Sequence, residues 1–466
     1  MEQAGFTKRK RLGYCLGITT ESILYNMFYT YYLIFLTDVV KLNPALAGTV
    51  NLISVAWDAI TDPIVGKYAD REGVDKRKLM LKAAIPVGIT FVGAFLPLGD
   101  NTNEWLKFFF YVAMTMLFWL AYTVYTIPYY AVVAEITQDY DERTAIRGQS
   151  SLFNTVCIFM GNAVPSLLPG ILGGLIASIA FGWTLTAVVM GAIAIVAGLV
   201  AAASLKGVRL QKAEAQQAQE KGSFKEYLEI LRIKPFRWFV MFVFFFLVAT
   251  SMIQTNFTFL VKHKLGMSDD DMVIVIVTLV AAMAVIIPIV TKIAEKTDRR
   301  ITSIIFTAIT LVALVVIKFI GISNVVMLIV SVVACAIGLG CFWTVFYSMS
   351  YDLVEVDEYV NGKRRESMIT AFPQFFQKFG AAIGMWLAGQ VLSWGKYDAE
   401  LATQPDSAKT AIENISTIIP AAFLVFAVIG LIFYPVTKKS FEALKEKLEL
   451  KRQGKKTDNK GIEKLV

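Results

Sequence analysis

The sequence predicts an all-α polytopic membrane protein with twelve transmembrane helices in two six-helix bundles. Three observations support this prediction: the composition, the spacing of the apolar runs and a long polar segment near the middle of the chain. Of the 466 residues, 56% are hydrophobic and only 18% are charged, and the mean hydropathy is +0.58. This composition is far too apolar for an ordinary soluble domain, so most of the chain is expected to lie in a lipid bilayer.

Twelve apolar runs are each long enough to cross a membrane. A helix needs about 20 mostly apolar residues to span the hydrocarbon core. The first run is too long for the core of a signal peptide and is followed by no small-residue cleavage site, so we expect it to be retained. The runs lie at residues 13–37, 45–69, 79–98, 106–136, 149–174, 178–204, 237–262, 271–292, 302–321, 325–351, 367–394 and 410–436.

The longest polar segment extends from Ser204 to Trp238 and leaves six apolar runs on each side. A loop with both acidic and basic residues follows the second run of each half, at residues 66–78 and 292–300. The same loop at the same place in both halves indicates a parallel internal repeat. The expected domains are an N-terminal bundle at 1–204, a cytoplasmic linker at 205–236, a C-terminal bundle at 237–437 and a charged cytoplasmic tail at 438–466.

Lysine and arginine are concentrated in alternate loops. If both termini are cytoplasmic, 35 of the 45 basic residues lie in cytoplasmic arms and loops, with the boundary residues Arg237 and Lys292 counted as loop. The positive-inside rule therefore predicts cytoplasmic termini, in the plasma membrane or a bacterial inner membrane. The net charge of +8 follows from this topology and from attraction to anionic membrane lipids. No soluble surface remains to bind nucleic acid, and we expect a monomer.

The cysteine and histidine content excludes most enzyme classes. The four cysteines lie within predicted helices and have no CxxC spacing, which is typical of small apolar packing residues. The single histidine, His263, cannot supply a histidine metal site, and the chain cannot assemble a Ser-His-Asp triad. We therefore predict no enzymatic activity, no structural metal and no cofactor.

Two carboxylates lie in the second apolar run, within the stretch WDAITDPIVG. Asp58, Thr61 and Asp62 share one face of the predicted helix. Each acid costs roughly 2.5–3.5 kcal/mol near the bilayer centre, so both must face a cavity or a partner. Carboxylates this close repel unless one is protonated or a cation lies between them. Oxygen ligands suit Na⁺, and the same pair could bind H⁺. Pro63 leaves a nearby carbonyl free to kink the helix or to coordinate.

An architectural ion pair is the alternative explanation for these acids, although no basic residue lies in the middle of the first six runs. In the second half, Lys378 lies well inside the eleventh run. Its expected partner is the acidic pair or Glu21, and a pair between the two halves would break and form as they move.

Polar and aromatic residues are interleaved in the first and fourth runs. Rings mixed with carboxyl, amide and hydroxyl groups inside a membrane helix typically line a wet cavity, where rings stack on sugars and polar groups bind hydroxyls. The candidate solute-binding residues in these runs are Glu21, Ser22, Asn26, Thr126 and Tyr130.

The loop after the second run has the spacing G-x-x-x-D-R-x-G-x-x-K-R-K, which includes Gly66, Asp70, Arg71 and Gly73. This pattern resembles the loop signature of the major facilitator superfamily, and the six-plus-six layout agrees with it. The alternative is an ordinary basic cytoplasmic loop.

Five motifs occur in order between Gly13 and Trp394, and together they resemble the glycoside-pentoside-hexuronide:cation symporters, whose best-known member is the melibiose permease. The resemblance implies the major facilitator fold and symport of a sugar with Na⁺ or H⁺. The motifs are LTDVVKL, WDAITDPIVGKYADR, YTIPYYAVVAEIT with YDERT, CFWTVFYSMSYDLVEVDEYVNGKRRES, and Lys378 in FPQFFQKFG.

The resemblance also assigns roles to particular residues. It implies a coupling-cation site formed by Asp58, Thr61, Asp62 and Thr123, where the family often has asparagine at the Thr61 position. It implies that Tyr130 and Trp343 flank the sugar and that Lys378 matches a functional lysine.

Two positions depart from the melibiose-type pattern, which carries aspartates there. These positions are Ser22, which is adjacent to Glu21, and Thr126. The departures put galactoside specificity in doubt and leave the cation chemistry intact.

Three other functions are compatible with parts of the sequence. Animal relatives of this superfamily branch handle amphipathic substrates, so lipid or lysolipid transport is one alternative. A transport-like sensor would signal through the linker and tail, but it has no need for the acid pair. An ion channel is the third.

Overall fold

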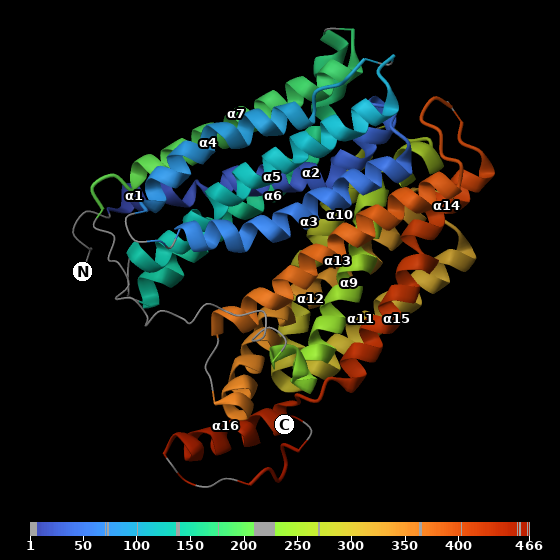
Figure 1. Cartoon of the computed structure of the whole chain (residues 1–466). Helices are drawn as coiled ribbons and strands as arrows, with labels where there is room; N and C mark the ends of the chain where they lie inside the picture. Colours follow the sequence, from blue (N-terminus) through green and yellow to red (C-terminus); the bar gives the residue numbers. More distant parts are fainter. Residues whose placement is uncertain are drawn as a thin grey trace. The chain divides into compact units, whose positions relative to one another are not determined.

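A computed structural model gives the fold of the chain (Figure 1). Within the part of the chain that it describes, helices are the only regular elements. This confirms the all-α prediction, and it fits a bilayer, where a helix satisfies its own backbone hydrogen bonds. The residues described are 7–69, 71, 74–99, 101–136, 140–175, 177–208, 229–268, 271–362, 366–401, 403–453, 455, 458–463 and 465.

Among the described residues of the first half, the structure has seven helices and one π-helical turn, η1, which continues α2. Their bounds are α1 (Lys8–Cys15), α2 (Ile18–Ile34), η1 (Phe35–Val39), α3 (Pro44–Ala69), α4 (Lys76–Ala94), α5 (Glu104–Ile136), α6 (Tyr140–Leu175) and α7 (Ile179–Ser204).

The second half contains a further π-helical turn, η2, which continues α9. Its elements are α9 (Lys234–Phe259), η2 (Leu260–Lys264), α10 (Met272–Lys296), α11 (Arg299–Ile320), α12 (Val325–Asn361), α13 (Glu366–Trp394), α14 (Asp406–Ser416), α15 (Ile418–Phe433) and α16 (Lys438–Arg452).

Each of the twelve predicted spans falls on helical residues. The first is divided into α1, α2 and η1, and the last is divided into α14 and α15 at Thr417. Among the described residues, eight helical segments are long and apolar enough to cross a membrane. The spans predicted on α2, α3, α4 and α13 are not among the eight. Helix α3 carries the two acids of the candidate cation site, and α4 begins with three basic residues, Lys76, Arg77 and Lys78. These four spans stay predictions.

One compact unit contains residues 1–217, 261–276 and 389–408. Within it, α3 and α4 pack against α5, α7 packs against α4 and α6, and α2 packs against α6 and α7. Aromatic rings fill its core, and Phe28 of α2 contacts both Phe118 and Trp119 of α5. The packing places α2, α3, α5 and α6, which carry most of the candidate site residues, in one unit.

The other compact unit contains residues 218–260, 277–388 and 409–466. In it, α15 packs against α9 and α11, and α12 packs against α11 and α16. Helix α13 approaches α9 closely at Gly380, where a Cβ atom would lie 2.7 Å from the carbonyl oxygen of Phe244. The small residue permits the two backbones to meet, as is common between membrane helices.

The two halves of the sequence repeat one helix-capping arrangement. Asp75 caps α4 by accepting a hydrogen bond from the Arg77 amide (3.0 Å), and Arg77 Nε donates to a backbone carbonyl near the end of α7 (3.0 Å). Asp298 caps α11 by accepting from the Arg300 amide (2.7 Å), and Arg300 Nε donates to a carbonyl near the end of α15 (3.0 Å). This correspondence is what an internal repeat requires. The domain boundaries themselves stay predictions, since linker residues 209–228 lie outside the described part.

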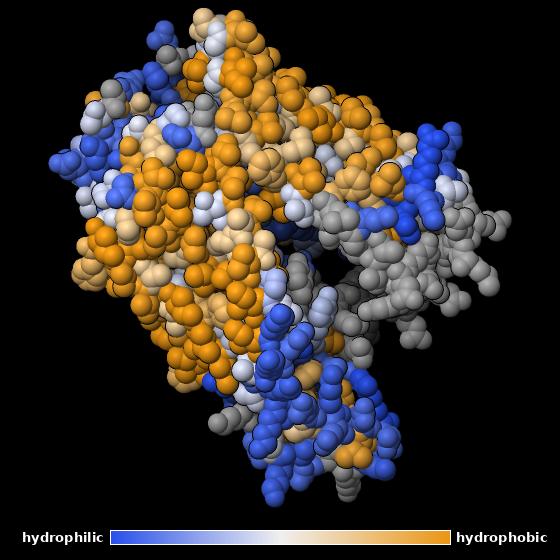
Figure 2. Space-filling model, turned by 180° about the vertical axis from the view of Figure 1, so that it is seen from behind, coloured by the Kyte–Doolittle hydropathy of each residue, from blue (hydrophilic) through white to orange (hydrophobic). Residues whose placement is uncertain are grey.

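The surface is that of a membrane protein. Figure 2 shows apolar side chains over much of the face in view, while hydrophilic side chains gather on α16 at the bottom. Large apolar residues such as Leu175, Phe319 and Trp394 are at least 74% exposed. Apolar exposure on this scale marks contact with lipid rather than with water.

Candidate cation and solute sites

The hydroxyl of Thr123 on α5 meets both carboxylates of α3. Thr123 Oγ1 lies 2.8 Å from Asp58 Oδ1 and 3.1 Å from Asp62 Oδ1. A hydroxyl carries one hydrogen, so it can donate to only one of these oxygens at a time. Asp58 and Thr123 are buried, and Asp62 is half-buried. The arrangement collects negative charge in a place where a cation or a proton would lower the repulsion.

Two further contacts hold α3 against α5. Ser54 Oγ donates to Thr115 Oγ1 (2.6 Å), and Trp57 Nε1 donates to the carbonyl of Met116 (3.1 Å). Both contacts lie N-terminal to the acid pair on α3, within one or two helical turns of it. They fix the helix that carries the acids against the helix that carries Thr123.

The chain after Asp58 supplies more oxygen atoms. Thr61 is buried, and its hydroxyl donates to the carbonyl of Asp58 (3.1 Å), which leaves the lone pairs of Oγ1 able to accept or to coordinate. Pro63 lies inside α3. Because proline has no amide hydrogen, the carbonyl of Ala59 loses its usual helical partner. Carboxylate, hydroxyl and carbonyl oxygens are the ligand types that a hard cation prefers.

Two phenols connect this site to the next. Tyr29 of α2 and Tyr122 of α5 lie close enough to Asp58 to interact with it electrostatically. Tyr122 also interacts in this way with Glu21 and Tyr130. The acid pair and the candidate solute residues are therefore neighbours within one unit.

Glu21 of α2 and Tyr130 of α5 are brought together. The Tyr130 hydroxyl donates to the carboxylate of Glu21, and both residues retain contact with solvent. Thr126, which is buried, lies one helical turn before Tyr130 and one after Thr123 on the same helix. Three of the predicted solute and cation residues thus lie along α5.

The amide groups of Asn26 and Asn162 form a chain of hydrogen bonds between α2 and α6. Asn26 Nδ2 donates to the Ser22 carbonyl (2.7 Å), and Asn162 Nδ2 donates to Asn26 Oδ1 (3.2 Å). Thr30 Oγ1 in turn donates to Asn162 Oδ1 (2.6 Å). Sequence reasoning found Ser22 and Asn26 but missed Asn162.

Gly161 gives a signal that could have found Asn162. A Cβ atom at Gly161 would lie 2.8 Å from the carbonyl oxygen of Ile23. The glycine therefore lets α6 approach the backbone of α2 closely, and it places the polar side chain next to it, Asn162, at this contact.

Trp343 and Lys378 belong to the other compact unit. Trp343 on α12 is 37% exposed, and its ring packs edge-on against Phe342 with centroids 5.3 Å apart. Lys378 on α13 is half-buried. Its pairing with Glu21 or with the acids of α3 stays a prediction.

The predicted loop signature is only partly described. Gly66 lies in the last turns of α3, with open space where a Cβ would be. The Arg71 guanidinium lies 5.7 Å from the centroid of the Tyr68 ring. Asp70 and Gly73 lie outside the described residues.

A profile of the family described as MFS/sugar transport protein matches residues 13–438. The chain belongs to this family. The predicted resemblance is therefore confirmed, and this MFS protein is an integral membrane transporter rather than an enzyme.

Two relatives and one solved structure show how far the likeness extends. This MFS transporter is 26% identical to the isoprimeverose transporter of Lactiplantibacillus pentosus, over 92% of its own length and 89% of the relative's. It is 24% identical to the sodium-dependent lysophosphatidylcholine symporter 1-A of Danio rerio, over 90% and 84%. A bacterial homologue of the human lysosomal transporter Spinster shares the fold, with a TM-score of 0.68 at 16% identity, over 95% and 98%.

Proposed function

We propose that this transporter is a symporter that couples entry of a glycoside, oligosaccharide or related sugar to Na⁺ or H⁺. Asp58, Thr61, Asp62 and Thr123 form the cation site. The observation that carries the proposal is the Thr123 hydroxyl, which lies within hydrogen-bonding distance of both carboxylates. An architectural role alone gives no reason for two acids and one donor to meet inside a membrane protein.

Coupling follows from the position of the solute residues. A cation neutralises the acid pair, and Tyr122 lies in electrostatic reach of Asp58, Glu21 and Tyr130. Thr123 of the cation site and Thr126 and Tyr130 of the solute site lie on successive turns of α5, so a change of charge at Asp58 would arise close to the solute. By thermodynamic linkage, the cation then raises solute affinity and the solute raises cation affinity by the same factor.

The remaining predicted roles complete the proposal. Ser22, Asn26 and Thr126 bind solute hydroxyls, Trp343 stacks on the sugar, and Lys378 pairs with an acid across the pathway. Rocking of the two six-helix halves alternates access, with the loop containing Gly66, Asp70, Arg71 and Gly73 at the cytoplasmic side.

The proposal also specifies the cellular setting. The protein acts as a monomer surrounded by lipid in the plasma membrane, or in the inner membrane of a bacterium, with both termini in the cytoplasm. The positive-inside charge distribution supports this orientation.

Uptake into proteoliposomes tests the proposal. Purified protein is assayed with a panel of glycosides, disaccharides and hexuronides under an inward Na⁺ gradient, an inward H⁺ gradient or neither. We expect at least one sugar to accumulate under one of the gradients and only to equilibrate without it. If no sugar is accumulated under either gradient, the proposal is wrong.

Lysolipid transport is the second candidate, and the relative from Danio rerio favours it. The absence of the two family aspartates at Ser22 and Thr126 also removes carboxylates that would bind sugar hydroxyls. Adding a lysophospholipid to the same panel separates the two, because only this candidate predicts Na⁺-dependent uptake of lysolipid with no sugar accumulation.

A further inference from the structure

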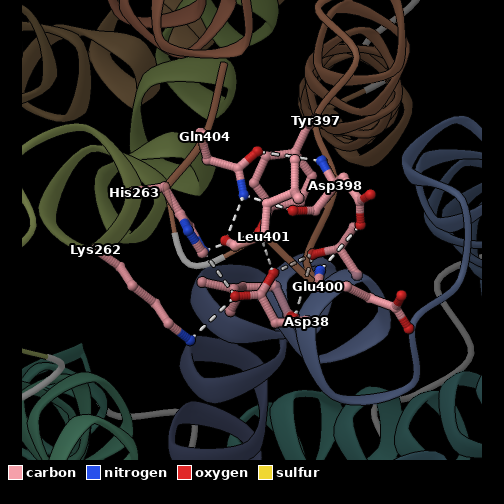
Figure 3. Close-up of polar contacts among 10 residues, drawn as sticks. Asp38, Lys262, His263, Tyr397, Asp398, Glu400, Leu401 and Gln404 are labelled. Carbon is pink, nitrogen blue, oxygen red and sulfur yellow. Dashed lines mark hydrogen bonds and ion pairs between the residues drawn. The ribbon is translucent and has the colours of Figure 1, made fainter. Parts of the chain in front are cut away.

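Another carboxylate with little exposure, that of Asp38, lies outside the acid pair. Asp38, in η1, is 8% exposed at its side chain and is surrounded by hydrogen-bond donors (Figure 3). Lys262 Nζ lies 3.0 Å and His263 Nε2 2.7 Å from Asp38 Oδ2. The Tyr397 hydroxyl donates to Oδ1, and so does Thr37 Oγ1 (3.0 Å). We call Asp38, Lys262, His263 and Tyr397 the outer latch.

The latch joins three segments that are distant in sequence. Asp38 ends the first predicted span, Lys262 and His263 end the seventh, and Tyr397 follows the eleventh. Residues 261–276 and 389–408 are nevertheless part of the same compact unit as the first six spans. The outer latch therefore connects the first half of the sequence to two elements of the second half.

The chemistry of the latch is ionic and hydrogen-bonded rather than apolar. Burial raises the pKa of Asp38, but the hydrogen bond and charge of His263, with Lys262 and Tyr397, outweigh it and leave that pKa below its ordinary value. The carboxylate is therefore charged at neutral pH. It gains its stability from groups on the other segments, and it would lose that stability if those segments moved away.

The same segments also meet through an exposed ion pair, a hydrogen bond and a close backbone approach at a glycine. Lys41 and Glu400 form an exposed ion pair at 3.3 Å, and Gln390 Nε2 donates to the carbonyl of Ala45 (3.2 Å). At Gly389, a Cβ would lie 2.5 Å from the carbonyl oxygen of Pro44. Water can replace hydrogen bonds of this kind when the segments separate.

Two π-helical turns present the charged groups. Asp38 lies in η1 and Lys262 and His263 lie in η2. The first and seventh spans, which these turns end, are equivalent elements of the internal repeat. A π turn is rare and is found most often at functional sites. Its occurrence at both equivalent ends favours a role beyond packing.

We propose that the outer latch holds the outer end of the solute pathway closed and that it must break for the site to open outward. With both termini inside, the first, seventh and eleventh spans all end on the outer side of the membrane. Rocking of one half of the sequence against the other would pull Asp38 away from Lys262, His263 and Tyr397. The inference rests on the proposed transport function.

Distance measurements between spin labels test the latch without relying on transport. Labels are placed on Asn101, in the outer loop before α5, and on Ser323, in the outer loop before α12. Both are exposed and outside helices, and the four buried native cysteines are first replaced. In lipid nanodiscs, Asp38→Asn is expected to raise the ratio of long to short distances about tenfold, from the loss of a charged hydrogen-bond acceptor.

Matched variants make the test specific. Tyr397→Phe removes one hydrogen bond to Asp38 and is expected to give a smaller shift in the same direction. Glu400→Gln breaks the exposed ion pair between the same segments and is expected to leave the distances unchanged. If Asp38→Asn does not fold, the same distances are measured in Tyr397→Phe and His263→Gln, and these two variants test the proposal instead. Wild-type distances in the folded latch variants would overturn the proposal.

The outcome for the latch is separable from that for symport. If the latch variants shift the distances while no solute is ever accumulated by the wild type, the proposed function fails and the latch stands. If the wild type accumulates solute and the folded latch variants keep its distances and uptake rates, the latch fails and the proposed function stands.

Discussion

The hydroxyl of Thr123 lies within hydrogen-bonding distance of both acids of the proposed cation site. The hydroxyl has one hydrogen, so it can donate a hydrogen bond to only one of the two carboxylates at a time. A bound cation or proton would lower the repulsion that remains between the two carboxylates. The acids Asp58 and Asp62 could be predicted from the sequence, because two charges four residues apart in an apolar run demand an explanation. Thr123 belongs to the polar and aromatic stretch of the fourth run, but only the resemblance to a known family assigned it to the cation site.

Substitution of Thr123 tests its role directly. Thr123→Val keeps the shape and removes the oxygen, so we expect cation affinity to fall about tenfold or more, since hydrogen bonds to charged groups contribute ~1.5–3 kcal/mol. Thr123→Ser should retain most of the affinity. The cation-dependent rise in melting temperature reports the change.

Thr115→Val is the matched control for that experiment. Thr115 is also buried on α5 and also bonds to α3, through Ser54, but it touches neither acid in the contacts described. Its loss should lower stability and leave cation affinity unchanged. Equal losses of affinity in the two variants would mean that Thr123 acts only by holding the helices together.

Asp38 gives a pH prediction whose sign follows from its surroundings. Its pKa is held below the ordinary value of 3.8, so its contribution to stability is present above that value and is lost as the pH falls through the lower one. Between pH 8 and pH 5 the melting-temperature difference between wild type and Asp38→Asn should not shrink. A difference that disappears by pH 5 would show that the carboxylate is not stabilised as described.

At the scale of elements, the contact of α2 with α6 decides where the solute residues lie. Gly161 lets the two helices approach, and the hydrogen-bonded amides of Asn26 and Asn162 follow from that approach. Long apolar runs predicted the helices themselves, because span length and apolarity are local properties. The partner of each helix depends on packing between distant segments, and for this reason Asn162 was missed.

Gly161→Ala tests this contact. The added methyl would meet the Ile23 carbonyl, so we expect a loss of about 1–3 kcal/mol in stability and weaker solute binding. Melting temperature and solute titration measure the two effects.

Gly170→Ala on the same helix is the control for that substitution. A Cβ there meets open space, and alanine favours the helix by about 0.5–1 kcal/mol. It should be neutral or stabilising. If both substitutions behave alike, the close approach at Gly161 is unimportant.

Some features of the elements could not have been predicted from apolar runs. The break at Thr417 and the π-helical turns η1 and η2 leave no mark in the hydropathy of the chain. Asp38 and His263 were visible in the sequence, yet their meeting depends on contacts between residues more than 200 positions apart. Local pattern carries no information about such contacts.

At the scale of the whole molecule, the two halves of the sequence share a design. Asp75 with Arg77 and Asp298 with Arg300 make the same caps and the same contacts in equivalent places. The sequence predicted this repeat from its charged loops, because capping residues and basic loops are local signals. The four residues of the proposed cation site, by contrast, all come from the first half, so the proposal places an asymmetric function on a repeated scaffold.

We propose that the acid pair couples a cation to a solute, and the Asp62→Asn variant tests this coupling. In proteoliposomes loaded with the identified solute, the variant should still exchange labelled solute across the membrane, because the solute residues are intact. It should fail to accumulate solute when an inward Na⁺ or H⁺ gradient is applied, while wild type and Thr115→Val accumulate it. Gradient-driven accumulation by Asp62→Asn at the wild-type level would show that the acid pair does not couple the cation to the solute.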